Sequence, residues 1–262
     1  MDMGLYAQLH GLTKIARKSP TSQAEDKSDF DNAVQEYTDL IIDEEKKNFQ
    51  AGVESFAEHK AKVRQQLYDT MHEFSKNYEN GFKALCDALE EEGQERPVVS
   101  EEALKIFNDH TAFMKEIKEG RSIYELLGFS YETVLTFYKA LNKLFEKKEY
   151  ETVKDGLIFL TTISPNTVEF WVSLGMTFSK LGDYDNAIEN FLYALELDPT
   201  SQDAYLGCIH AYVQTNNVDE ADKLCDHGIE LAKVNTDQVW AGDLETVLTN
   251  VKTVIKTNFS GS

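Results

Sequence analysis

The chain has 262 residues, which is long enough for one large domain or two smaller ones. Of these residues 42% are hydrophobic and 27% are charged, as is typical of a globular protein. Its 46 acidic and 26 basic side chains give a formal net charge of −20. Such a charge argues against nucleic acid and anionic membrane surfaces as partners, because both select basic faces. No apolar run approaches the roughly 18 residues of a membrane span, so membrane insertion is not expected.

Four prolines and 14 glycines leave little turn chemistry, and the abundance of Leu, Ala, Glu and Lys predicts an all-α fold. Residues 1–28 combine a weakly amphipathic helix over 2–18 with a flexible linker. That helix is either a membrane-surface or partner helix, or a loosely docked terminus.

Residues 29–118 are expected to form a region of long helices. Apolar residues recur in steps of three and four through 29–92, except in a charged stretch at 43–52, which predicts two long helices or one weakened helix. A helix of about 60 residues would need a partner along its length, so a hairpin or small bundle is favoured. A further helix is predicted over 101–118.

Turn residues separate this region from the rest of the chain. Gly120 is expected to end the helix over 101–118, and Gly128 to end a short helical turn. Ser130 is a candidate N-cap for the helix that follows, because its hydroxyl can accept a hydrogen bond from a free backbone N–H.

Residues 168–199 read as one complete helical hairpin. Small residues allow two helices to approach closely, large apolar residues fill the seam, Gly182 ends the first helix and Pro199 stops the second. The spacing is that of a tetratricopeptide repeat. The residues that carry it are Trp171, Leu174, Gly175, Phe178, Gly182, Tyr184, Ala187, Phe191, Ala194 and Pro199.

The same pattern recurs at steps of 34 residues, and Pro165 and Pro199 are themselves 34 apart. The turn position holds Lys148, Gly182 and Asn216 in successive copies. The register predicts three repeats at about 134–165, 168–199 and 202–233, within a domain of residues 119–235. One more amphipathic helix over 236–258 is expected to cap this solenoid, because a terminal repeat must cover its open face.

Residues 118–233 resemble the class II (LcrH/SycD-like) chaperones of bacterial type III secretion systems. The resemblance rests on the Gly-containing turn over 119–130, on Tyr150-Glu151 and Pro165 of the first repeat, and on the run over 170–175 with Gly182. It implies a cytoplasmic bacterial protein that holds an extended segment of a hydrophobic translocator or effector in a concave groove and keeps it soluble before export.

Helix geometry predicts which side chains would line the groove, because positions two, five, nine, twelve and thirteen of each first helix share its inner face. Apolar members would form pockets, whereas Asn142, Lys180 and His210 could satisfy the backbone of a bound peptide. The predicted peptide-binding groove comprises Leu135, Tyr138, Asn142, Phe145, Glu169, Val172, Met176, Lys180, Leu206, His210 and Val213.

Other side chains point to scaffold roles. Trp171, Phe178 and Phe191 are expected in the core, and the seam cysteines Cys208 and Cys225 are expected to be buried thiols. With no C-x-x-C pair, no paired histidines and no nucleotide-binding or nucleophile motif, the sequence indicates neither an enzyme nor a metal or cofactor site.

Two other functions stay open: a general adaptor that binds proteins through its repeats, and a secretion regulator or effector built on them. A clamp for a chain terminus would need several inward-facing basic residues, and only Lys180, Lys139 and Lys143 qualify. The sequence also leaves open a homodimer through the N-terminal helices.

Overall fold

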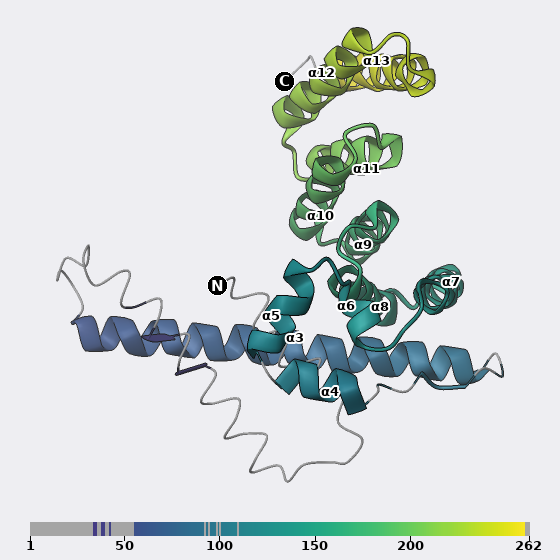
Figure 1. Ribbon diagram of the computed structural model, residues 1–262. Coiled ribbons are helices and arrows are strands. Elements are labelled where there is room, and N and C mark those ends of the chain that lie inside the picture. The colour runs from purple at the N-terminus through teal and green to yellow at the C-terminus, as the bar shows by residue number, and fades with distance from the viewer. Residues whose placement is uncertain are drawn as a thin grey trace. The chain divides into compact units, whose positions relative to one another are not determined.

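A computed structural model describes the chain at residues 34–35, 38–39, 42, 55–91, 93, 95–97, 99, 101–108 and 110–259. Every element in these ranges is an α-helix (Figure 1). The chain divides into two compact units, Met1–Phe137 and Tyr138–Ser262. The helix predicted over 2–18, the linker over 19–28 and the weak stretch at 43–52 lie outside the described residues.

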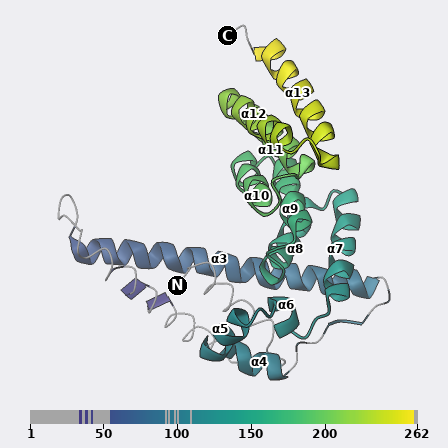
Figure 2. The ribbon, with the colours of Figure 1, turned by 45° about the horizontal axis from the view of Figure 1, so that its top comes forward.

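The first unit contains the long helix α3 (Phe56–Glu91), continuous over 36 residues (Figure 2). Ser55 caps it reciprocally, because its Oγ accepts from the Glu58 N–H at 3.3 Å and its own N–H donates to Glu58 Oε2 at 2.8 Å. An ion pair of 2.5 Å joins Lys60 of α3 to Asp39, one of the helical residues described at 34–35, 38–39 and 42. This pairing is consistent with the predicted hairpin or small bundle.

Short helices follow in the same unit: α4 (Glu101–Asn108), α5 (His110–Lys118) and α6 (Ile123–Leu126). Helices α4 and α5 occupy the range 101–118 that the sequence predicts as helical, and α4 contacts α5. Residue 109, between them, lies outside the described residues.

The turns after α5 and α6 are those that the glycines predicted. Gly120 and Gly128 have φ of 90° and 82°, in the left-handed region. Helix α7 (Tyr131–Glu146) then begins at its predicted cap, since the Thr133 N–H donates to Ser130 Oγ at 3.1 Å. Phe129 packs edge-on against Phe137 of α7 with ring centroids 5.8 Å apart.

The second unit, which begins within α7 at Tyr138, is a stack of helix pairs, seen in succession in Figures 1 and 2. The first helices of the three repeats are α7, α9 (Val168–Leu181) and α11 (Gln202–Gln214), and the second helices are α8 (Tyr150–Ile163), α10 (Tyr184–Leu197) and α12 (Val218–Val234). The chain then forms α13 (Val239–Phe259), which packs against α12. The predicted tetratricopeptide-repeat solenoid with a terminal capping helix is confirmed.

The 34-residue register has a direct counterpart in the turns. Lys148, Gly182 and Asn216 all adopt positive φ, of 65°, 81° and 60°. In each turn the next N–H donates back to the carbonyl five residues earlier, as from Asp183 to Phe178 at 3.0 Å and from Asn217 to Tyr212 at 2.8 Å. The three turns are therefore structural repeats of one another.

The central core is built around Phe191 of α10, which is 1% exposed. Its ring lies against Gly175 of α9 and Gly207 of α11, so one aromatic side chain joins two successive first helices. Trp171 and Phe178, predicted as core, are half-buried and pack against this cluster. The Trp171 indole N–H also donates to the Pro165 carbonyl oxygen at 2.7 Å, which ties α9 to the end of the preceding repeat.

Candidate functional site

The candidate site is the face of the first helices that is not covered by the second helices. Its central row consists of Asn142, Met176 and His210, which occupy the same position in the three repeats. All three side chains are exposed, and Met176 is 44% exposed although it is large and apolar. Helices α9 and α11 are in direct contact, so Met176 and His210 lie on neighbouring helices.

Tyr138 is the best-anchored member of this face. Its ring packs at 5.0 Å from that of Phe170, and its hydroxyl shares a 2.7 Å hydrogen bond with Ser173 Oγ. Both partners belong to α9, so Tyr138 joins the first helices of repeats one and two. Ser173 was not among the predicted residues. Its position, directly after the fifth residue of the first helix, is the signal in the sequence that could have identified it.

Val172 occupies the position in α9 that Tyr138 occupies in α7, but it contributes differently. It is only 8% exposed and belongs to the apolar cluster around Phe191. We therefore correct its predicted role: Val172 supports the face from beneath and offers little surface to a peptide.

In the third repeat, Leu206 and Val213 are half-buried on either side of the exposed His210. The His210 ring lies 6.2 Å from that of Tyr184, edge to face, and its Nε2 is 3.4 Å from Gln214 Nε2. These contacts hold the imidazole at the surface with hydrogen-bonding capacity toward solvent.

The remaining predicted residues lie toward the ends of the first helices. Phe145 is half-buried against Tyr150, with ring centroids 5.1 Å apart, whereas Glu169 and Lys180 are exposed at opposite ends of α9. Leu135 is half-buried on α7 but belongs to the first compact unit, so it is not part of the face described here.

Potential metal ligands and cysteine thiols also occur in the part of the chain that the structure describes. No group of three His, Cys, Asp or Glu side chains there could hold a metal ion. Cys208 and Cys225 are buried as predicted, and burial raises the thiol pKa of Cys208 to about 12 and that of Cys225 to about 11. Both therefore remain protonated near neutral pH. Within the same residues, no helix combines the length and the apolar character that a bilayer crossing requires.

Comparison with known proteins agrees with this geometry. The tetratricopeptide repeat family matches residues 180–242. A T3SS complex from Aeromonas hydrophila shares the fold, with a TM-score of 0.51 and 16% identity over 58% of this chain and 100% of that chain. A search of curated proteins finds no match.

Two further solved structures are similar at lower TM-scores. The Yersinia enterocolitica type III secretion translocator chaperone SycD has a TM-score of 0.46 and 19% identity over 52% of this chain and 98% of that chain. PcrH, in complex with the chaperone binding region of PopD, has a TM-score of 0.44 and 15% identity over 50% of this chain and 96% of that chain. The chain therefore has an all-α helical-repeat fold, whose residues 180–242 match the tetratricopeptide repeat family and which it shares with the T3SS complex from Aeromonas hydrophila.

Proposed function

We propose that this protein is a bacterial cytoplasmic chaperone of type III secretion, which holds an extended hydrophobic segment of a translocator or effector on the inner face of its first helices. The observation that carries the proposal is the row of Asn142, Met176 and His210, exposed at equivalent positions on the first helices of three successive repeats. The fold shared with a T3SS complex and the sequence resemblance to class II chaperones support the same function.

The chemistry of the row suits an extended peptide. Met176 offers a flexible, polarisable side chain that adapts to different apolar partners. Asn142 and His210, on the two flanking helices, carry donors and acceptors that can satisfy an extended backbone. The half-buried Tyr138 and Leu206 would form the walls beside the central methionine.

The charge of this face distinguishes the proposal from a terminus-binding adaptor. Capture of a C-terminal carboxylate normally uses several converging basic side chains. The lysines that could serve this face are Lys139 and Lys143 on α7 and Lys180 on α9. On α9 and α11, Lys180 is accompanied by the acidic Glu169 and Asp203. An internal hydrophobic segment is therefore a better match than a free carboxyl terminus.

The test is co-purification of the client from a secretion-competent bacterium, with bound proteins identified by mass spectrometry. We expect Met176→Glu, and more strongly Tyr138→Ala/Met176→Glu, to reduce recovery of a translocator-like client by at least about tenfold, because a buried charge opposes apolar binding. Helicity by circular dichroism should be retained.

Val254→Glu is the matched control, because Val254 is 58% exposed on α13, which is not one of the first helices. It should leave client recovery unchanged. Equal recovery with the Met176 variants would refute the inner face as the client site. Recovery of folded soluble proteins alone, with no translocator-like client, would favour the adaptor function instead.

A further inference from the structure

A second surface lies on α10, on the side turned away from the apolar cluster. Ala187, Ile188, Phe191 and Ala194 of α10 are buried in that cluster. The opposite stripe carries residues at i, i+4, i+7, i+8 and i+11, which share one helix face. All of them are exposed: Asp185, Glu189, Leu192, Tyr193 and Glu196, a set named here the α10 stripe.

The α10 stripe has apolar residues at its centre. Leu192 and Tyr193 are 36% and 38% exposed, with acidic residues before and after them on the same face. The Tyr193 ring also packs on Trp171, with ring centroids 4.3 Å apart. This support holds Tyr193 in place before any partner arrives, which lowers the entropy cost of binding.

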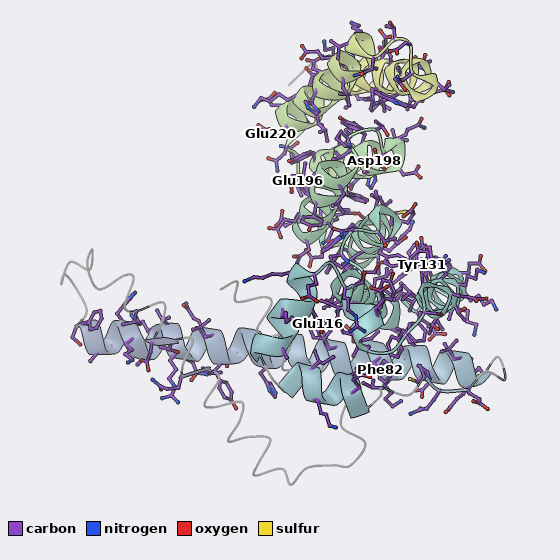
Figure 3. The ribbon with its side chains drawn as sticks, in the orientation of Figure 1. Phe82, Glu116, Tyr131, Glu196, Asp198 and Glu220 are labelled. Carbon is purple, nitrogen blue, oxygen red and sulfur yellow. The ribbon has the colours of Figure 1, made fainter. Side chains whose placement is uncertain are left out.

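The charge of the stripe is not neutralised within the fold. Residues 181–222 contain nine Asp or Glu residues and no Lys or Arg. Within the described part of the chain, Asp185, Glu189 and Glu196 form no ion pair or hydrogen bond through their carboxylates. Of the three, Glu196 is labelled in Figure 3. By contrast, acidic residues of α12 do find lysines: Glu220 pairs with Lys223, and Asp222 with Lys252.

We propose that the α10 stripe docks a basic amphipathic helix of a partner protein. Apolar side chains of that helix would contact Leu192 and Tyr193, and its Lys or Arg residues would face the carboxylates on either side. From Asp185 to Glu196 the stripe spans about 16 Å at ~1.5 Å per residue, so about three turns of a partner helix would cover it. A second copy of this chain does not fit, because its net charge of −20 opposes close approach to an acidic face.

The probe is a synthetic 15-residue amphipathic helix with leucines on one face and flanking lysines, titrated against the full chain by fluorescence anisotropy. Binding should weaken as salt rises and should vanish for a twin peptide with glutamates in place of lysines. The double reversal Glu189→Lys/Glu196→Lys should weaken binding about tenfold or more, because each change replaces an attraction by a repulsion. Leu192→Ser should weaken it severalfold.

The matched control is Glu230→Lys/Asp243→Lys, which changes the net charge equally at exposed positions of α12 and α13. It should change affinity less than about twofold. Equal weakening by the two double variants would overturn the proposal, because it would show attraction to the overall charge. Undetectable binding would overturn it too. Loss of binding in Met176→Glu but not in the stripe variants would place the helix on the inner face and likewise contradict the proposal.

Discussion

At the scale of single residues, the turns between paired helices show how the repeat tolerates imperfect sequence. Gly182 meets the left-handed geometry without a steric penalty, whereas Lys148 adopts φ of 65° with a full side chain. The left-handed conformation costs a residue with a Cβ roughly 1–2 kcal/mol. The first repeat therefore carries a local strain that the second repeat lacks.

We expect Lys148→Gly to stabilise the protein by about 0.5–1 kcal/mol, because relief of the strained backbone outweighs the greater freedom of glycine in the unfolded chain. Chemical denaturation monitored by circular dichroism would measure the change. The matched control is Lys147→Gly, one residue earlier, where φ is not positive. It should destabilise by a similar amount, and a stabilising Lys147→Gly would contradict this account.

Position-specific burial limits how far the binding face could be predicted from the sequence. The helical period assigns Val172 and Met176 to the same face, yet they are 8% and 44% exposed. The difference depends on side-chain length and on how closely α10 approaches, neither of which the period contains. The hydrogen bond between the Tyr138 and Ser173 hydroxyl oxygens, 2.7 Å apart, likewise depends on how closely α7 approaches α9. The helical period does not contain that distance.

At the scale of elements, close packing of helices is achieved by different residues in different repeats. In the second repeat, Gly175 of α9 makes room for Phe191. The first repeat has Leu141 at the corresponding position, and there Gly156 of α8 accommodates the leucine. The 34-residue register predicted the helix pairs and their turns, but not which of two facing helices would carry the small residue.

We expect Gly207→Ala to destabilise the protein by about 1–2 kcal/mol. Alanine is the better helix former by about 1 kcal/mol, but its methyl group would overlap the buried ring of Phe191, and overpacking typically costs about 1–3 kcal/mol. Equilibrium urea unfolding would measure the loss.

The control for this prediction is Gly242→Ala in α13, where a methyl group would meet nothing within 4 Å. That variant should gain stability, by about 0.5–1 kcal/mol. In a Phe191→Leu background the penalty of Gly207→Ala should shrink or disappear, since the smaller side chain leaves room. A penalty that stays unchanged there would show that the ring is not its cause.

At the scale of the whole chain, each repeat of a solenoid is stabilised by contacts with the adjacent repeats. The exposed apolar face of the last repeat therefore needs a capping helix. In the second unit α13 supplies it: Leu244, Leu248 and Ile255 are buried with Tyr205 and other apolar residues of the third repeat. Exposed threonines along α13 present a polar outer side, namely Thr246, Thr249, Thr253 and Thr257. The helix therefore ends the stack rather than offering a further repeat face.

An ionic cluster joins the capping helix α13 to α12. The Lys252 ammonium of α13 contacts Asp222 at 3.2 Å and also pairs with Asp226, both from α12. Burial by itself lowers the pKa of Lys252, but the hydrogen bonds to Asp226 and Asp222 outweigh burial and raise it above its ordinary value. The stabilisation is thus fully present below the ordinary lysine pKa and is lost as pH rises through the higher value in the folded protein.

We therefore expect Lys252→Met to reduce hydrogen-exchange protection in α12 and α13 while leaving α9 and α10 nearly unchanged, because coupling in a solenoid is local. The free energy of unfolding should fall by about 1–2 kcal/mol, because the substitution leaves the partly buried carboxylates of Asp222 and Asp226 without their cation. The control Lys223→Met removes an ion pair within α12 alone and should have little effect.

Because Lys252 loses its charge at alkaline pH, the stability difference between the wild type and Lys252→Met should narrow as pH rises past the ordinary lysine value of about 10.5. Tyrosines titrate in the same range, but they are common to both proteins and cancel in the difference. A stability difference that stays constant with pH would mean that methionine disturbs the packing, and that the charge of Lys252 does not stabilise the contact between α13 and α12.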